Sequence, residues 1–564
     1  MTILTILYNS HNTSVALIKD RKILFAASNE RYSRKKMDSG IPLKALKACL
    51  VQTRIKVSDI DEVVFVSDPF PKSFVEYFKF YALPFIKTKG KYLLWLKKPS
   101  KIIKALIYGS IIPVYIVKEL YPLLRIKWEL KGFKGKYFFV PHHMSHLYSA
   151  YYASGWKECL VACFEGAGLV DAVSIYHVKN NNWTRISGSS VPDSPGMFYA
   201  LITSILGFKP LRHEGKITGL SAYGNPNKAY SFVKSLLSVD KGVLKVNYDL
   251  WLRTSTYYDV NKKLPENLRK FKREDLAAAF QKRLEVCVTE VVKYALKRYK
   301  VDKIALSGGV VANVKLNQRI HELAGIKEIY IHPGMGDEGL VLGAALYKAD
   351  LFVKLKNLYL GSSYSDREVL KAIKKYGVSH KKIKNIEKEI ARLIFEGKVV
   401  GRYLGKMEYG PRALGNRSIL CEATDPTINA TLNKKLKRTE FMPFAPVALK
   451  EFAHKCFKNL KGAEYTAGFM TITFDCTPYM KKKCPAVVHV DGTARPQIIE
   501  KSQNPSYYKI LKEYYKLTSI PALINTSFNM HEEPIVCSPD DALRSFITGA
   551  LDCLAIDNYL VWKE

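Results

Sequence analysis

Short apolar runs of strand length alternate with helix-length segments along the first half of the chain. Residues 2–8, 14–18 and 22–27 have the apolar pattern of strands, with a polar loop that contains His11 between the first two. Farther along, apolar residues keep helical spacing over 276–295, and a short apolar run at 304–306 follows. This alternation predicts an α/β fold, in which ligands collect at turns that follow strands.

A pair of histidines stands where a predicted strand gives way to a predicted helix. His142 and His146 follow Pro141 and the strand-like run 137–140. Residues four apart on a helix share one face, so the two imidazoles can converge on one divalent cation. Packing or capping by the same histidines is the alternative, and the spacing alone leaves the two interpretations equal.

A glycine-rich turn at 334–339 offers a third metal ligand. It follows the apolar run 329–331 and precedes a helix of small residues that begins near Leu340. Glycines let the backbone approach a ligand closely, and a helix N-terminus favours an anion. Asp337 in this turn is therefore the candidate ligand, with a role as a helix cap as the alternative.

A second glycine turn follows the predicted strand 304–306. Gly308 and Gly309, with Asn313 just beyond, lie between that strand and a helix, an arrangement that can cradle a phosphate. Most Gly-Gly turns are only turns, so this motif is weak by itself. Its place about thirty residues before Asp337 puts two ligand-friendly turns after successive strands.

Charge and cysteine usage restrict the setting of the protein. The net charge of +37, from 88 Lys and Arg against 51 Asp and Glu, favours anionic partners, although scattered lysines on solvated faces explain most of it. The 10 cysteines form no CxxC pair, which argues against a disulfide framework or a zinc ribbon. Together with an N-terminus that lacks a basic leader, this predicts a cytoplasmic protein.

The segment from 87 to 131 differs from the rest of the chain. Lysines in 87–104 alternate with aromatic and apolar residues, and an amphipathic stretch follows up to Lys131. Its most apolar part, 105–117, is too short for a membrane span, which needs roughly 20 apolar residues. The pattern predicts a segment that lies on a membrane surface or covers an acceptor site.

The second half, beyond a predicted boundary between 350 and 384, concentrates basic residues among tight turns. Guanidinium groups hold phosphate and carbonyl oxygens bidentately, so arginines beside Gly-Pro turns suit a phosphate-rich substrate. Solvated lysine faces are the alternative, and they explain the cluster at 434–438 better than the arginines at 412 and 417. The candidate contacts to a phosphorylated ligand or nucleotide are Lys406, Arg412, Arg417, Lys437, Arg495, Asn525 and Ser527.

Six motifs follow one another along the chain. They are Glu30-Arg31-x-x-Arg34-x-Lys36, His142-His143-x-x-His146, Glu214-Gly215-Lys216-x-x-Gly219-Leu220, Gly336-Asp337-Glu338-Gly339, Gly410-Pro411-Arg412-Ala413-Leu414-Gly415-Asn416-Arg417-Ser418 and Asn525-Thr526-Ser527-Phe528-Asn529. Taken together and in this order, they resemble the carbamoyltransferases of the class that includes nodulation-factor and antibiotic O-carbamoyltransferases. The resemblance runs nearly from end to end.

The resemblance implies an α/β protein with two domains. Residues 1–360 would form a carbamoyl-transfer domain of the actin-like ATPase (ASKHA) type, a duplicated ribonuclease-H-like fold similar to the transferase of tRNA threonylcarbamoylation. A basic aromatic insert would occupy about 68–135 of it. Residues 361–564 would form an α+β YrdC-like domain.

The same resemblance implies a two-step reaction at two sites. The C-terminal domain would join carbamoyl phosphate and ATP into carbamoyl adenylate, with Mg²⁺ assisting, through Lys406, Arg412, Arg417, Lys437 and Arg495. A metal, Fe²⁺ in characterised relatives, would be held by His142, His146 and Asp337 and would help transfer the carbamoyl group to a hydroxyl. His11 and Lys36 would serve acceptor-side proton transfer and adenylate contact, while Gly308, Gly309 and Asn313 would embrace the adenylate.

This chain departs from the family pattern at three positions. Many relatives have Phe-Arg-Pro-Phe-Ala-Pro where this chain has Met442 as the second residue, so Arg438 is a candidate replacement for the missing arginine. Glu165 stands where Asp is common, and Glu532 stands where Gly is frequent.

Two other functions compete with O-carbamoylation. A tRNA-modifying carbamoyl transferase would explain the positive charge, but the basic residues form no evident nucleic-acid recognition module. A metal-dependent hydrolase would explain the histidines, but the chain lacks the Glu of His-Glu-x-x-His. The expected acceptor is a small molecule or glycan. Peripheral membrane contact through the insert and a homodimeric state stay open.

Overall fold

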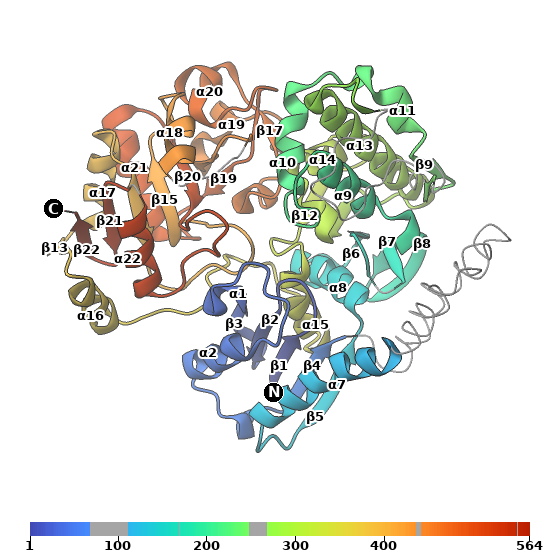
Figure 1. Cartoon of the computed structure of the whole chain (residues 1–564), viewed down its shortest axis with the longest axis horizontal. Coiled ribbons are helices and arrows are strands. Elements are labelled where there is room, and N and C mark those ends of the chain that lie inside the picture. Colours follow the sequence, from blue (N-terminus) through green and yellow to red (C-terminus); the bar gives the residue numbers. More distant parts are fainter. Residues whose placement is uncertain (68–110, 169, 248–267, 436–440, 550, 564) are drawn as a thin grey trace, which may run out of the picture.

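The computed structural model describes residues 1–67, 111–168, 170–247, 268–435, 441–549 and 551–563. They form a mixed α/β protein with three main sheets (Figure 1). In this view the first sheet lies at the bottom in blue, the second right of the centre in teal and yellow-green, and the third at the upper left in orange and red.

The first sheet has five strands, with the order β3-β2-β1-β4-β5. β1, β2 and β3 are antiparallel, and β4 and β5 extend the sheet from β1 in parallel. The strands are β1 (Thr2–Leu7), β2 (Ser14–Lys19), β3 (Lys22–Ser28), β4 (Glu62–Val66) and β5 (Lys136–Val140). The strands expected at 2–8, 14–18 and 22–27 are therefore confirmed to within one residue at each end.

The second sheet repeats this topology. Its order is β12-β11-β6-β7-β8, with β6, β7 and β8 antiparallel and with β11 and β12 parallel to β6. The strands are β6 (Glu158–Phe164), β7 (Asp171–Lys179), β8 (Asn182–Ser190), β11 (Lys303–Ser307) and β12 (Glu328–Ile331). A long helix, α13 (Arg273–Arg298), contains the helical pattern expected at 276–295 and buries its apolar face in this lobe.

Two helices pack between the first two sheets. α8 (His142–Ser154) and α15 (Leu340–Lys348) join residues of both sheets in one apolar cluster. They approach closely at Gly343, where an added Cβ would lie 2.1 Å from the Ser145 carbonyl oxygen. The other α-helices described in these two lobes are α1 (Glu30–Ser33), α2 (Leu43–Thr53), α7 (Ile111–Glu129), α9 (Pro195–Ile205), α10 (Glu214–Leu220), α11 (Tyr230–Lys234) and α14 (Val314–His321). A hairpin of β9 (Leu237–Asp240) and β10 (Val243–Val246) lies beside them.

The third sheet has eight strands of mixed direction, with the order β13-β22-β21-β14-β15-β20-β16-β19. Helices α17 (Ile386–Phe395) and α21 (Pro505–Thr518) pack against each other over one apolar cluster, and α16 (Asp366–Tyr376) packs against α22 (Pro539–Thr548). Its strands are β13 (Ser379–Lys382), β14 (Val400–Tyr403), β15 (Arg417–Cys421), β16 (Ala445–Leu449), β19 (Gln497–Ile499), β20 (Ala522–Ser527), β21 (Cys553–Ile556) and β22 (Tyr559–Trp562).

Short elements complete this part of the chain. They are the helices α18 (Ile428–Lys435), α19 (Ala453–Cys456) and α20 (Pro478–Lys483) and the small pair β17 (Phe474–Asp475) and β18 (Thr493–Ala494). One expectation is corrected here. The apolar run 522–524 predicts a strand that ends before Asn525 and Ser527, but β20 continues through Ser527 because these residues pair with β15 and Asn525 also pairs with β16.

Two arginines of the first lobe tie it to the third sheet. Arg31 donates a 2.7 Å hydrogen bond to the Gly410 carbonyl oxygen. Arg34 donates to the carbonyl oxygens of Ile535 at 2.7 Å and Pro534 at 2.8 Å, and it forms an ion pair with Asp541 at 3.3 Å. The Glu30-Arg31-x-x-Arg34 motif therefore acts partly as a structural tie between the two halves.

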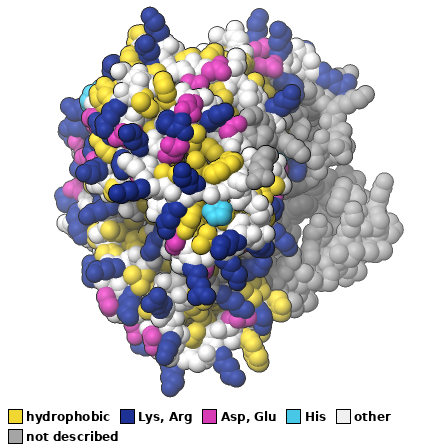
Figure 2. Space-filling model, turned by 90° about the vertical axis from the view of Figure 1, so that its left-hand side faces the viewer, with side chains coloured by type: hydrophobic (Ala, Val, Ile, Leu, Met, Phe, Trp, Pro, Cys, Tyr) yellow, Lys and Arg dark blue, Asp and Glu magenta, His cyan; other side chains and the backbone are white. Residues whose placement is uncertain are grey.

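The spread of charged side chains on the surface and the state of the cysteines are as the sequence predicts. Figure 2 shows Lys and Arg spread over one face with Asp and Glu between them, and they do not gather into one stripe on that face. All 10 cysteines are buried and unpaired, as expected from their spacing.

Among the described residues, no helix combines the length and the apolar character that a membrane span needs. Most of the basic insert expected at 68–135 lies outside the described residues, which resume with α7.

Candidate functional site

The two histidines predicted to share a helix face do so. Pro141 precedes the first turn of α8. His142 and His146 lie about one helical turn apart on α8, and their ring centroids are 5.2 Å apart. His146 is fully buried, whereas His142 is 18% exposed. Solvent therefore reaches this face of α8 at His142 but not at His146.

Three parallel strands bring polar residues to the same edge of the second sheet, next to these histidines. Glu165 directly follows β6, Ser307 ends β11, and Asp337 lies in the turn after β12. Because β6, β11 and β12 are parallel neighbours, their carboxyl ends meet at one edge. Asp337 lies close to both histidines, and Glu165, which was not predicted as a ligand, lies beside them too.

The four side chains form a compact cluster. His142 Nε2 lies 3.4 Å from a Glu165 oxygen and 3.7 Å from an Asp337 oxygen, and His146 Nε2 lies 3.2 Å and 3.6 Å from the same two oxygens. One ligand atom from each of the four lies within 4.8 Å of the others. Two imidazoles and two carboxylates are a donor set that suits a first-row divalent metal.

Opposite charges tune this cluster. Burial disfavours the charged imidazole, but Glu165 and Asp337 outweigh it and raise the pKa of His146 to about 10 and that of His142 above its usual value. Burial likewise opposes ionisation of the two acids, yet His146 and His143 lower the pKa of Glu165, and His142 and His146 lower that of Asp337. The carboxylates therefore favour the protonated form of the two imidazoles, and the imidazoles favour the ionised form of the two carboxylates.

A metal ion fits these residues. The Nε2 atom of His146 is buried and faces the Glu165 and Asp337 oxygens without forming a hydrogen bond to either, although its Nδ1 atom contacts the Ser307 hydroxyl at 3.2 Å. Metal ligation would satisfy this nitrogen and both carboxylates at once. Asp337 also accepts a hydrogen bond from the Ser10 hydroxyl.

The third histidine of the motif has a different place. His143 contacts the Glu165 carboxylate through Nδ1 and the Ser174 hydroxyl through Nε2 at 2.6 Å. It is thus a partner that orients Glu165. Ser10, Ser307 and His143 were not predicted, because their roles depend on contacts between segments distant in sequence.

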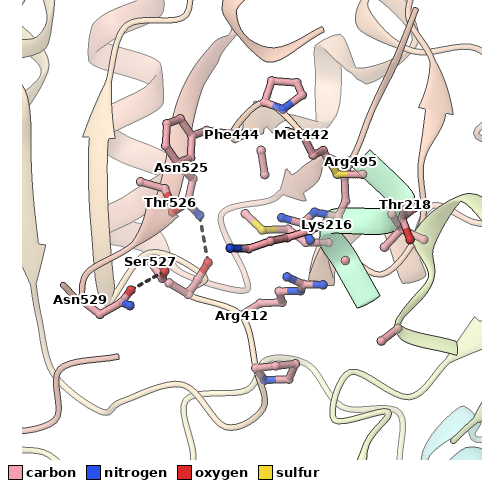
Figure 3. A pocket seen from close by; sticks show the side chains of 18 of the residues that line it. Lys216, Thr218, Arg412, Met442, Phe444, Arg495, Asn525, Thr526, Ser527 and Asn529 are labelled. Atoms are coloured by element: carbon pink, nitrogen blue, oxygen red, sulfur yellow. Dashed lines mark hydrogen bonds between the residues drawn. The ribbon is translucent and has the colours of Figure 1, made fainter. Parts of the chain in front are cut away.

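A cavity of about 320 Å³ lies between the two halves of the chain. In Figure 3, Lys216 of α10 and Arg412 and Arg495 of the second half converge on it. Its apolar side includes Met442 and Phe444. Several positive charges around one hollow create a field that favours a polyanion.

The cavity brings together five of the predicted residues. These are Lys36, Arg412, Arg495, Asn525 and Ser527. Asn525 donates to the Ala413 carbonyl oxygen at 3.1 Å, and Ser527 donates to Asn529 at 2.6 Å. Lys216 was named only as part of a motif, and Arg212 and His213 beside it were missed. Nothing in the local sequence shows that they face the second half.

Other predicted residues do not reach the cavity. Arg417 is fully buried, donates to the carbonyl oxygens of Leu404, Gly405 and Asn416, and lies over the Tyr403 ring, so it supports the loop rather than lining the hollow. Lys406 is exposed and does not line the hollow, although its carbonyl oxygen accepts from Asn416 at 2.8 Å. Lys437 and Arg438 lie outside the described residues.

Gly308, Gly309 and Asn313, which were expected to embrace the adenylate, do not line the cavity. Asn313 caps α14 through Leu316 N and contacts Gln281, and the cavity wall beside it is made by Ala312 and Val314. Gly308 packs against the Phe164 carbonyl oxygen, where a Cβ would lie 2.3 Å away, and Gly309 faces open space. His11 is exposed.

Two segments connect the cluster to the cavity. The Tyr409 hydroxyl donates to the Glu338 carbonyl oxygen at 2.8 Å, next to Asp337, while Pro411 and Arg412 of the same loop line the cavity. The second segment runs from Ser307, which contacts His146, to Ala312 in the cavity wall. The two sites are thus neighbours in the fold.

The chain is similar to several known proteins. An uncharacterised protein of Methanocaldococcus jannaschii is 34% identical over 100% of this chain and 99% of its own length. Nodulation protein NolNO of Sinorhizobium fredii is 28% identical over 98% of this chain and 79% of its own, and nodulation protein U of Rhizobium tropici is 26% identical over 98% and 95%. A crystal structure of HypF from T. kodakarensis has a TM-score of 0.36 at 10% identity, over 62% of this chain and 48% of that chain, which is too low to carry an argument.

Two family models cover most of the sequence. The model of the carbamoyltransferase N-terminus matches residues 2–346, and that of the carbamoyltransferase C-terminus matches residues 391–563. The first includes all four residues of the histidine–carboxylate cluster, and the second includes Arg412 and Arg495. The family expected from the sequence motifs is confirmed: the chain belongs to the carbamoyltransferase family, and it is an enzyme of that class.

Proposed function

We propose that this enzyme is an ATP-dependent O-carbamoyltransferase that activates the carbamoyl group in the basic cavity and transfers it at the histidine–carboxylate cluster. The observation that carries this proposal is the pairing of the two sites. A polyanion-binding hollow and a metal-ligating cluster lie next to each other and are joined by the loop that holds Tyr409, Pro411 and Arg412.

The two parts of the fold suit two reaction steps at separate sites. The repeated strand order of the first two sheets supports a duplicated ribonuclease-H-like unit of the actin-like ATPase type for the first 360 residues. The mixed eight-stranded sheet with helices on it supports a YrdC-like assignment for residues 361–564. In open α/β sheets ligands bind beyond the carboxyl ends of parallel strands, where Glu165 and Asp337 lie.

The cavity side chains suit the activation step. Carbamoyl phosphate and one water give carbamate and phosphate, and carbamate oxygen then attacks the α-phosphorus of ATP, forming carbamoyl adenylate as pyrophosphate leaves. Arg412, Arg495 and Lys216 would stabilise the phosphates, and Mg²⁺ would accompany the nucleotide. Asn525 and Ser527 offer neutral contacts, and the wall at Met442 and Phe444 suits the base.

The cluster residues suit the transfer step. His142, His146, Glu165 and Asp337 would hold a divalent metal, for which Fe²⁺ is the expected ion. Such a metal supplies Lewis-acid polarisation of the carbamoyl carbonyl. The acceptor oxygen forms the new bond to the carbamoyl carbon, AMP leaves, and the hydroxyl proton is released.

His143 and Ser307 orient the ligands of the transfer site through their contacts to Glu165 and His146. We expect the acceptor to be a hydroxyl of a glycan or small molecule. Contact of the basic insert with a membrane surface remains part of this proposal.

Pyrophosphate release tests the activation step. The full chain, with Mg²⁺ and Fe²⁺, should release pyrophosphate only when both ATP and carbamoyl phosphate are present. Release with ATP alone would indicate an ordinary ATP pyrophosphatase. No release with both substrates would contradict the proposal for the second half of the chain.

A further inference from the structure

One acidic side chain lies among the basic ones that line the cavity. Glu532 is the single Asp or Glu among the described lining residues, while the other charged side chains there are Lys, Arg or His. It belongs to the turn after β20, and its side chain is 32% exposed. A carboxylate in a hollow built for anions calls for a ligand group that is not anionic.

Two side chains of the first half hold this carboxylate in place. Arg212 Nη2 lies 2.6 Å from one oxygen, and His213 Nε2 lies 3.3 Å from the other. Although burial opposes ionisation, His213, Arg212 and Lys36 keep the pKa of Glu532 below its usual value. The group is therefore an ionised acceptor with a fixed orientation.

The backbone at Glu532 adds to this argument. Its φ of +62° is in the left-handed region, which is unfavourable for an L-residue and suits glycine. Glycine could therefore replace Glu532 without backbone strain.

The remaining capacity of the carboxylate defines what it can bind. A carboxylate has about four lone-pair sites, so roughly two remain after the contacts to Arg212 and His213. The guanidinium at 2.6 Å disfavours a divalent cation there, because like charges repel. A second anionic group is excluded by the carboxylate itself. The fitting partner is a neutral group with two adjacent hydrogen-bond donors.

We propose that Glu532 accepts hydrogen bonds from the 2′- and 3′-hydroxyls of the ribose of the bound nucleotide, and so selects ribonucleotides. This inference rests on the proposed function, since it requires ATP in the cavity. The vicinal diol is the neutral part of ATP with two adjacent donors, and carboxylates bind ribose hydroxyls in this way in dinucleotide-binding folds. Adenine is a poorer match, because its N6 donor lies beside the acceptor N7.

The test compares ATP with 2′-deoxy-ATP and 3′-deoxy-ATP. In the full chain, kcat/KM for pyrophosphate release should favour ATP by about tenfold or more, as expected for hydrogen bonds to a charged group. Glu532→Gly, which suits the backbone, should reduce that preference to about twofold or less. Arg212→Met should keep the preference even if activity falls, because the carboxylate remains.

Glu533→Gln is the matched control. Glu533 pairs with Arg544 at 2.9 Å and does not line the cavity, so this variant should keep the wild-type ratio. Measuring the binding of each nucleotide by calorimetry separates affinity from turnover.

Several results would overturn the inference. Equal use of ATP and both deoxynucleotides by the wild type would do so, as would an unchanged preference in Glu532→Gly. A variant that instead needs more Mg²⁺ would indicate a metal ligand, and one that loses discrimination against inosine triphosphate would indicate contact with the base. If wild-type protein neither binds nor uses ATP, both the proposed function and this inference are wrong. If it uses ATP and both deoxynucleotides equally well, only this inference is wrong.

Discussion

Glu165 joins the histidines of the cluster into one site. Its carboxylate lies 3.4 Å from His142 Nε2, 3.2 Å from His146 Nε2 and in contact with His143 Nδ1. His142, His146, Asp337 and Glu165 together form the donor set of four that we propose to hold a metal ion. The affinity of the centre for metal should therefore depend on Glu165 as well as on the histidines.

Glu165→Gln tests that dependence. The neutral amide is a weaker ligand, so the affinity for Fe²⁺ should fall by at least about tenfold, measured anaerobically by competition with a chelator. Glu158→Gln at the other end of β6, where Glu158 pairs with His177 and Lys179, is the matched control and should bind metal as the wild type does. Equal affinities of Glu165→Gln and wild type would remove Glu165 from the metal site.

The cluster also predicts how the stability of metal-free protein depends on pH. His146 has a pKa of about 10 in the folded protein, compared with about 6.5 when unfolded. The folded state therefore binds more protons between these values. The stabilisation is complete below pH 6.5 and is lost as the pH rises towards 10, with a slope of up to about 1.4 kcal/mol per pH unit.

Urea unfolding of chelator-treated protein at pH 7 and pH 9 measures this effect. The free energy of unfolding should be lower at pH 9, and the difference between the two pH values should shrink in His146→Asn. A wild-type difference equal to that of His146→Asn would exclude the histidine as its source.

Single residues differ in how far the sequence alone could place them. His142, His146 and Asp337 have local signals, namely helical spacing and a glycine-rich turn after a strand. Glu165 also follows a strand, but its role depends on the parallel order of β6, β11 and β12, which no local pattern contains. Arg417 was expected in the cavity because its neighbours resemble those of Arg412, although the fold turns it inward.

At the scale of elements, the contact between α8 and α15 positions the histidines. Gly343 of α15 lies against the first turns of α8, and an added Cβ would lie 2.1 Å from the Ser145 carbonyl oxygen and 2.7 Å from Ser149 N. Both atoms belong to α8 itself, so a larger residue must push the helices apart. Such a shift would move His142 and His146 relative to the carboxylates on the sheet edge.

Gly343→Ala should therefore weaken both stability and metal binding. Overpacking predicts a loss of about 1–3 kcal/mol in the free energy of unfolding, measured by urea denaturation. Gly215→Ala in α10, where nothing lies within 4 Å of the added Cβ, should change stability little or raise it by roughly 0.5–1 kcal/mol. A Gly343→Ala protein as stable as wild type would show that the helices adapt.

Elements were easier to predict than their arrangement. The strands β1, β2 and β3 and the helix α13 follow from apolar periodicity, and the start of α8 follows from Pro141 after a strand-like run. The order of strands in each sheet does not, because pairing is decided by contacts far apart in the chain. The end of β20 was missed for the same reason, since polar Asn525 and Ser527 continue a strand only because neighbouring strands pair with them.

At the scale of the whole molecule, the cavity exists only while the two halves stay together. Lys36, Arg212 and Lys216 come from the first half, while Arg412 and Arg495 come from the second. Arg34 holds the halves together through the carbonyl oxygens of residues 534 and 535 and through Asp541. From the sequence, we expected the activation chemistry in the second half alone. The contribution of the first half to the cavity depends on contacts between distant segments, which no local pattern shows.

Arg34→Met tests the tie. Loss of the hydrogen bonds and the ion pair should lower the free energy of unfolding by about 3 kcal/mol, and the thermal transition should broaden or split as the halves unfold separately. Arg21→Met is the control, because Arg21 donates to the Asp350 carbonyl oxygen at 3.1 Å, within the part of the chain before residue 360. A single sharp transition at the wild-type temperature in Arg34→Met would show that the tie is dispensable.

The central claim, activation in the cavity and transfer at the cluster, is tested most directly by separating the two steps with labelled carbamoyl phosphate. His146→Ala should still form carbamoyl adenylate and release pyrophosphate, and the labelled adenylate should accumulate because transfer stops. Arg412→Ala should form none. If His146→Ala instead loses pyrophosphate release to the same extent as Arg412→Ala, the two steps share one site and the account is wrong.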